Sequence, residues 1–142
     1  MNIDFYKHPQ NPILSSKDIP YASNQVYNAG VIKYQGKYVM VFRNDYDRSH
    51  DDFKEHAAKG LGFPPVKINL GIAYSDDGIN WEVADEPCFE LANDEIKHAY
   101  DPRLTVLEGR VYICFAIDTR HGVRGGIAVT DDFDKFKILN AT

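Results

Sequence analysis

The sequence has few cysteines and no long apolar run. Two of its 142 residues are cysteine and one is tryptophan. Cys88 and Cys114 each lie in apolar sequence, so we expect two buried free thiols rather than a disulfide. No segment approaches the roughly 20 apolar residues of a membrane span. The start of the chain lacks a charged region followed by an apolar one, so we expect no signal peptide, no membrane partner and a cytoplasmic location.

The sequence also lacks an excess of basic residues. Its 16 Lys and Arg stand against 21 Asp and Glu, which gives a formal net charge of −5. Proteins that bind nucleic acid need clustered cations to meet the phosphate backbone, so nucleic acid is not an expected partner. The hydrophobic fraction of 44% is that of a globular chain, and the length corresponds to about one domain.

What the chain does contain is an internal repeat. Residues 27–42 (YNAGVIKYQGKYVMVF) return as 100–115 (YDPRLTVLEGRVYICF), an offset of 73 residues. Residues 71–77 (GIAYSDD) return as 126–132 (GIAVTDD), an offset of 55, so the first copy carries an insertion of 18 residues. Repeats of this length in strand-rich sequence indicate the blades of a propeller or another β array.

Each copy contains four predicted strands, so the predicted fold class is all-β. The turn Gln35–Gly36 between the first two strands is typical of a tight hairpin. Proline-rich residues 1–25 are predicted to be an extended leading segment. Residues 26–85 are predicted to form the first unit of the array, blade one, and residues 99–139 the second, blade two. The predicted strands are 26–34, 37–43, 67–74 and 80–83, then 104–107, 110–117, 122–130 and 135–139.

The insertion at residues 46–66 contains one predicted helix, near residues 50–59. Ser49 and Asp52 resemble a capping box, and Phe53 and Ala57 share one helix face. Two interpretations stay open: the helix shapes the mouth of a site, or it is a solvated helix that covers an edge. The histidines of this segment do not align on one helix face, so we predict no metal site.

Carboxylates are densest in two turns, to which we assign a structural role. Asp76 and Asp77 recur as Asp131 and Asp132. Asp and Ser side chains in such turns accept hydrogen bonds from nearby backbone N–H groups, and Gly78 supplies a positive φ. Because the same residues occur at equivalent positions of both copies, stabilising the turn explains them better than catalysis does.

Function is expected where the two copies differ, since repeats share the residues of their scaffold. Asn28 corresponds to Asp101, and both lie at the end of a predicted strand. An amide, a carboxylate and guanidinium groups that converge would suit a polyhydroxylated substrate. Pro102 is expected to hold Asp101 in extended geometry. The alternative is an Asp–Arg pair that only fastens a strand end. The other differing pairs are Gly30 with Arg103 and Arg43 with Ala116.

A second group of polar residues follows the second predicted strand of blade two. Arg120 is a candidate anion contact, with His121 beside it. His98 precedes Asp101, and a single histidine near a strand end is more often structural than catalytic.

Seven short segments spread over nearly all of the chain form a recognisable ordered set. They are 11–14 (NPIL), 27–30 (YNAG), 41–43 (VFR), 75–81 (SDDGINW), 101–105 (DPRLT), 121–124 (HGVR) and 130–133 (TDDF). In this order they resemble glycoside hydrolase family 130, which comprises β-mannoside phosphorylases and related mannosidases. The form Tyr100-Asp101-Pro102-Arg103 is most similar to the branch that acts on mannosyl-glucose.

The resemblance implies a five-bladed β-propeller with its site in the central funnel. It implies inverting phosphorolysis, in which inorganic phosphate attacks the anomeric carbon of a β-mannoside and yields mannose 1-phosphate. Phosphate replaces water as nucleophile, so no second carboxylate is needed as a base. No cofactor is expected besides inorganic phosphate as co-substrate. The resemblance implies Asp101 as general acid, with Asn28 and Arg43 holding the sugar. To these we add Arg103 as a candidate sugar contact, and Arg120 and His121 as candidate phosphate contacts.

The resemblance also makes the length of the chain informative. Family members are longer, so we expect this chain to be two of five blades and only part of an enzyme. Two blades alone would leave apolar faces exposed, which predicts either a homo-oligomer or dependence on further blades. The alternatives are a non-catalytic carbohydrate-binding or assembly fragment, and a β-mannosidase of the same family.

Overall fold

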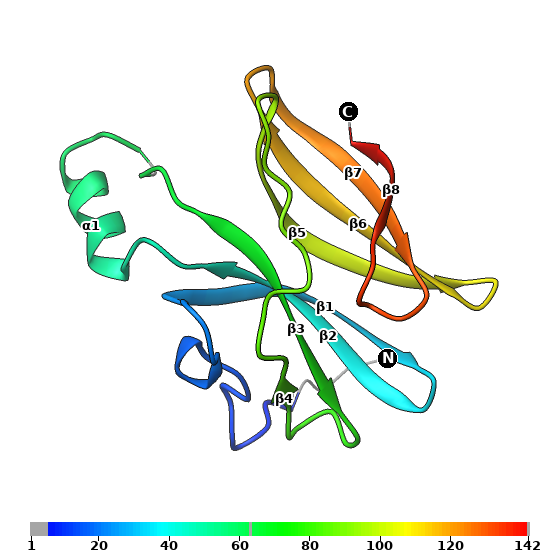
Figure 1. The fold of residues 1–142 in the computed structure, drawn as a ribbon. Coiled ribbons are helices and arrows are strands. Elements are labelled where there is room, and N and C mark those ends of the chain that lie inside the picture. The colour runs from blue at the N-terminus through cyan, green and yellow to red at the C-terminus, as the bar shows by residue number, and fades with distance from the viewer. Residues whose placement is uncertain (1–5, 63, 142) are drawn as a thin grey trace, which may run out of the picture.

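The computed structural model describes residues 6–62 and 64–141, and it arranges them as two four-stranded antiparallel sheets (Figure 1). Within each sheet, strands that are consecutive in the chain pair with each other, so each sheet is a meander. The predicted all-β fold is confirmed, whereas the division into domains stays a prediction. The first sheet contains β1 (Gln25–Tyr34), β2 (Lys37–Asp45), β3 (Ile68–Ser75) and β4 (Glu82–Val83), and the second contains β5 (Ile96–Leu107), β6 (Arg110–Thr119), β7 (Gly122–Thr130) and β8 (Lys137–Ala141).

β5 is the strand that the sequence predicted least well. We expected it at residues 104–107, but it begins at Ile96. Its first half is polar, contains Pro102 and is interrupted twice, because its register against β6 shifts between Ile96 and His98 and again between Tyr100 and Arg103. An irregular polar strand gives no alternating pattern, so periodicity alone does not reveal it.

β1 and β5 carry a bulge at the same point of the repeat. The register of β1 shifts between Tyr27 and Gly30, as that of β5 does between Tyr100 and Arg103. Asn28 and Asp101 lie in these bulges with φ of 52° and 56°. The expectation that Asp101 is extended is therefore wrong: the bulge turns its φ positive, a conformation that Asn and Asp tolerate better than most residues.

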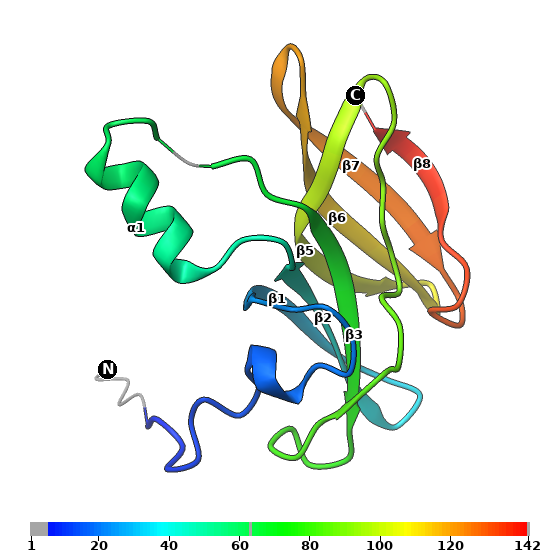
Figure 2. The same cartoon turned by 60° about the vertical axis from the view of Figure 1, so that its left-hand side comes forward.

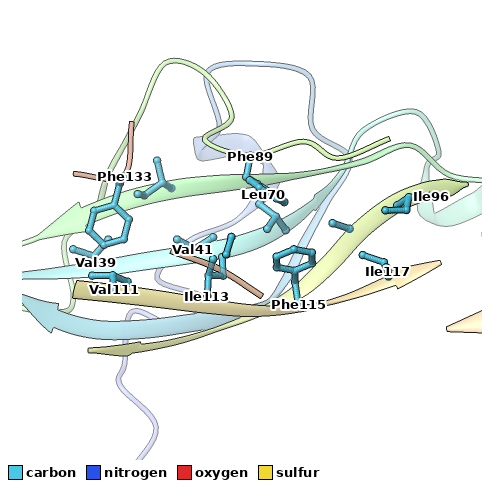
Figure 3. Close-up of a cluster of buried hydrophobic side chains, with 13 residues drawn as sticks. Val39, Val41, Leu70, Phe89, Ile96, Val111, Ile113, Phe115, Ile117 and Phe133 are labelled. Atoms are coloured by element: carbon cyan, nitrogen blue, oxygen red, sulfur yellow. The ribbon is translucent and has the colours of Figure 1, made fainter. Parts of the chain in front are cut away.

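The main core lies between the two sheets (Figure 3). Val39, Val41 and Leu70 of the first sheet pack with Ile113 and Phe115 of the second, and all five are buried. β2 is buried without interruption from Val39 to Phe42, as expected for a strand covered on both sides, whereas in β6 buried and more exposed residues alternate because its outer face is open. The packed pair of sheets fixes how β1 and β5 approach each other.

The outer faces of the two sheets differ. Met40 and Phe42, on the outer face of the first sheet, are covered by Ile19 and neighbouring residues of the leading segment. On the outer face of the second sheet Cys114 is exposed, so the expectation of two buried thiols is wrong for this residue. Cys88 packs against the main core, and burial raises the pKa of its thiol to about 12.

The predicted helix is confirmed as α1 (His50–Ala58), which projects away from both sheets in two views (Figures 1 and 2). Its capping box is formed: the Ser49 backbone N–H donates to Asp52 Oδ2 at 2.7 Å, and the Asp52 N–H donates to Ser49 Oγ at 3.3 Å. Across residues 6–62 and 64–141, no helix is long and apolar enough to cross a membrane.

Candidate functional site

The bulges of β1 and β5 contact each other where the two sheets meet. Asn28 Nδ2 donates to Asp101 Oδ1 at 2.8 Å. Arg103 Nη1 donates to the backbone carbonyl oxygens of Asn28 at 3.2 Å and Pro102 at 2.7 Å. The close approach depends on Gly30, because a Cβ there would lie 2.9 Å from the Pro102 carbonyl oxygen. Equivalent positions of the repeat thus meet at one junction.

Arg43 lies beside this junction and is held on several sides. Its Nε and Nη2 donate to the two carboxylate oxygens of Asp45, at 2.7 and 3.0 Å. Its guanidinium carbon lies 4.8 Å from the ring centroid of Tyr27 and 5.0 Å from that of Tyr100. Its Nη1 lies 3.6 Å from Asp101 Oδ1. The cation therefore reaches the predicted acid from a fixed direction.

The electrostatics of this cluster keep Arg43 charged and the two tyrosines neutral. Burial disfavours the charged guanidinium, but the hydrogen bonds and charge of Asp45 outweigh it and raise the pKa of Arg43. Burial, followed by the hydrogen bond to Asp45, raises the pKa of Tyr27. Burial and the hydrogen bond to Asp118 raise the pKa of Tyr100 to about 12. Both hydroxyl groups are therefore donors at neutral pH.

A cavity of about 880 Å³ opens beside Arg43 and the two tyrosines. Its other wall comes from the insertion, with Phe53 of α1 and residues 64–66. Of the two interpretations of the insertion, the structure favours the one in which it shapes the mouth of a site. The remaining lining residues are Ile68, Lys97, His98 and Asp118.

His98 is fastened within the second sheet. Its Nε2 lies 2.9 Å from Asp118 Oδ2, and the Tyr100 hydroxyl donates to Asp118 Oδ1 at 3.0 Å. The structural interpretation of His98 accounts for this pair, although the ring also borders the cavity.

Arg120 and His121 lie apart from the Asp101 cluster, at the turn between β6 and β7. Arg120 Nη2 forms an ion pair with Glu95 Oε1 at 2.6 Å, and its Nε donates to His121 Nε2 at 3.2 Å. His121 borders a second cavity of about 650 Å³ together with Arg124. The structure thus brings Asn28, Arg43, Asp101 and Arg103 together and leaves the two candidate phosphate residues outside that group; their role stays a prediction.

Two of the four carboxylates in these turns, Asp77 and Asp132, have the structural role that the repeat predicted, whereas Asp76 and Asp131 form exposed ion pairs. Asp77 Oδ1 accepts from the backbone N–H groups of Ile79 and Asn80, both at 2.8 Å. These bonds hold the pKa of Asp77 well below its ordinary value. Asp132 accepts in the same way from the N–H groups of Asp134 and Lys135, at 3.0 and 3.2 Å. Among the residues that the structure describes, no three His, Cys, Asp or Glu side chains gather where they could hold a metal ion.

Sequence reasoning missed the supports of Arg43. The Tyr27 hydroxyl donates to Asp45, and the Tyr100 hydroxyl donates to Asp118. The second pair is the first one repeated at the offset of 73 residues, so the repeat could have revealed a duplicated Tyr–Asp pair. Only Arg43 lacks a counterpart, since Ala116 stands at the equivalent position.

The two sheets meet at a junction that holds a carboxylate, an amide and a clamped guanidinium, and comparison with known proteins gives the family. The chain belongs to glycoside hydrolase family 130, whose profile, described as beta-1,4-mannooligosaccharide phosphorylase, matches residues 4–142. The resemblance seen in the sequence is therefore confirmed at the level of the family.

Individual relatives agree with this assignment. The chain is 29% identical over 143 residues to a beta-1,4-mannooligosaccharide phosphorylase of Ruminococcus albus, covering 92% of this chain and 37% of the relative. It is 32% identical over 108 residues to a beta-1,2-mannobiose phosphorylase of Thermoanaerobacter sp., a match that covers 73% of this chain and 34% of the relative. Its fold matches that of a beta-1,2-mannobiose phosphorylase from Listeria innocua in complex with beta-1,2-mannobiose, with a TM-score of 0.74 at 19% identity. This match covers 94% of this chain and 50% of the other. The chain thus spans half or less of the length of these three proteins.

Proposed function

We propose that this chain contributes the general acid and part of the sugar site to an inverting β-mannoside phosphorylase. The observation that carries the proposal is the contact of Asp101 with both Asn28 and Arg43, of which Arg43 lines the cavity, in a chain of this family. A carboxyl group between an amide and a guanidinium is held in one orientation, which proton transfer requires.

In the proposed reaction an oxygen of inorganic phosphate attacks the anomeric carbon of the mannosyl unit. The bond from that carbon to the acceptor oxygen breaks, and the acceptor oxygen receives the proton of Asp101, directly or through a sugar hydroxyl. The products are mannose 1-phosphate and the shortened saccharide. Asn28, Arg43 and Arg103 hold the sugar or the acid. Arg120 and His121 remain candidates for phosphate, and Arg120 would then exchange its ion pair with Glu95 for the dianion.

The finer proposal concerns the substrate. The segment Tyr100-Asp101-Pro102-Arg103 favours mannosyl-glucose, whereas the named relatives are phosphorylases of beta-1,4-mannooligosaccharide and beta-1,2-mannobiose. A panel of these three saccharides therefore separates the alternatives. The aromatic rings of Tyr100 and Phe53 on the cavity wall offer apolar faces on which a pyranose can pack.

We also propose that the two sheets are blades of a five-bladed propeller. Val41 and Ile72, on the inner face of the first sheet, are 0% and 3% exposed because the second sheet covers them. Their repeat counterparts on the second sheet are Cys114 and Ile127, of which the first is exposed and the second is 40% exposed. The repeat supports a third sheet on that face, packed as the second packs on the first.

The test is an assay of the whole protein that carries this chain, with each β-mannoside and inorganic phosphate. Formation of mannose 1-phosphate that depends on phosphate is the expected result. Release of free mannose alone would replace the phosphorylase by a β-mannosidase. Saccharide binding without any turnover would favour the non-catalytic alternative.

A further inference from the structure

We infer that Asp45 is a positioning residue, which fixes Arg43 in the orientation that serves Asp101. The inference rests on the proposed function, because it assigns Asp45 a part in the same site. It concerns a residue whose side chain does not line the cavity and therefore acts through its neighbour.

Asp45 has the surroundings that such a role needs. Its side chain is 0% exposed, and it accepts two hydrogen bonds from Arg43 and one from the Tyr27 hydroxyl. Its backbone carbonyl accepts from the Asn24 N–H at 2.8 Å, and its strand pairs on both sides, with Gln25 and Ile68. A buried carboxylate with these partners has one position available, and so does the guanidinium bound to it.

The two nitrogens that Asp45 occupies decide where the third one lies. Nε and Nη2 of Arg43 are engaged by Asp45, and the planar fork then directs Nη1 to the other side, where Asp101 Oδ1 lies 3.6 Å away. The rings of Tyr27 from β1 and Tyr100 from β5 lie within 5.0 Å of the guanidinium carbon. The cation is thereby held by both sheets, and Nη1 is the guanidinium nitrogen that has no bond to Asp45.

Comparison of the two copies of the repeat shows which part of this arrangement occurs in both sheets and which part occurs in the first sheet only. Tyr100 and Asp118 reproduce the Tyr27–Asp45 pair in the second sheet, but Ala116 stands where Arg43 would be. There the carboxylate accepts from His98 instead. The Tyr–Asp pair is therefore common to both sheets, and the first sheet alone uses it to orient a guanidinium.

The experiment compares Asp45→Asn with Arg43→Met and with the double variant, in the whole protein. An asparagine at position 45 has the same shape as aspartate, but its N–H₂ group cannot accept a hydrogen bond from Arg43, so one of the two bonds is lost. A misplacement of Arg43 by about 1 Å is expected to lower kcat/KM about 100-fold. The control is Asp131→Asn, which removes an equally bidentate pair with Arg110, 2.7 and 2.8 Å long, from an exposed turn outside the cavity. It should leave kcat/KM unchanged.

The double variant distinguishes positioning from general support of the fold. If Asp45 acts through Arg43, Asp45→Asn causes no further loss of kcat/KM once Arg43→Met is present. The double variant should melt at a higher temperature than Arg43→Met alone. Arg43→Met leaves the buried Asp45 carboxylate without its cation, and the neutral asparagine of the double variant removes that unpaired charge. Additive losses of kcat/KM, or an unchanged kcat/KM in Asp45→Asn, would overturn the inference.

A second readout needs no activity. In the whole protein labelled with ¹⁵N-arginine, the Arg43 Nε–H signal is identified by its absence in Arg43→Met. It should exchange slowly with water in the wild type and rapidly in Asp45→Asn. Equal exchange in both would contradict the positioning role. A protein that shows this difference but cleaves no β-mannoside would refute the proposed function and leave the orientation of Arg43 by Asp45 intact.

Discussion

Asn28 and Asp101 occupy equivalent positions of the repeat, and their side chains bind each other, with 2.8 Å between Nδ2 and Oδ1. The same bulge in both sheets brings the two positions to one junction. Two carboxylates so close would repel each other, whereas an amide beside a carboxylate forms a hydrogen bond. The difference between Asn28 and Asp101 therefore gives one carboxylate with a fixed neighbour.

Asp101→Asn should abolish most activity without unfolding the protein. The amide has the same shape but cannot deliver a proton, and loss of a general acid costs about 100-fold or more in rate. The measurement is mannose 1-phosphate release from the whole protein, with the melting temperature as the control for folding. A variant that keeps the wild-type rate would show that another group is the acid.

Gly30→Ala should separate the two bulges. Its Cβ would lie 2.9 Å from the Pro102 carbonyl oxygen and 3.2 Å from Arg103 Cα, and both are backbone atoms that cannot rotate away. Overpacking of this kind costs about 1–3 kcal/mol in the free energy of unfolding, measured by urea denaturation.

The matched control for this prediction is Gly125→Ala. A Cβ at Gly125 meets no atom within 4 Å, so stability should stay close to that of the wild type. Equal effects of the two substitutions would mean that the contact of β1 with β5 is not tight in solution.

Asp77→Asn should destabilise the chain at neutral pH, and the difference in stability between the wild type and this variant should become smaller in acid. The backbone N–H groups of Ile79 and Asn80 lower the pKa of Asp77 in the folded state below its model-peptide value. The stabilisation is therefore present above the unfolded-state pKa of about 3.9 and is lost as the pH falls through the lower, folded-state pKa. Thermal melts from pH 7 to acid measure it.

The neighbouring carboxylate supplies the control. Asp76 forms only an ion pair with Lys37, at 3.8 Å between exposed side chains, so Asp76→Asn should have little effect on the melts at any pH. A pH dependence as large for Asp76 as for Asp77 would contradict the turn-based explanation.

Cys114 reports whether a further sheet covers the second one. In the 142-residue chain its exposed thiol should react quickly with a thiol reagent, whereas Cys88 should react much more slowly, because it packs against the core. In a longer protein that contains the proposed third blade, Cys114 should be protected as well. Rapid labelling of Cys114 in that longer protein would refute the proposed packing of the third blade.

Much of the fold was predictable because its determinants are local. The strands with apolar periodicity, the Ser49 cap and the Asp77 turn each depend on residues close together in the chain. The beginning of β5 was not predictable, since its bulges break the alternating pattern. Of the site, the repeat pointed to Asn28 and Asp101, but it did not predict their positive φ or their mutual hydrogen bond.

The sequence by itself determined that the chain is a duplicated β structure and where its two copies differ in polar chemistry. It could do so because turns, caps and strand patterns follow from neighbouring residues. Only the tertiary structure decided that Arg43 is shared between two sheets, that Asp45 holds it, and that Arg120 lies elsewhere. These relations depend on how one sheet packs on the other, and that packing is set by the apolar core as a whole.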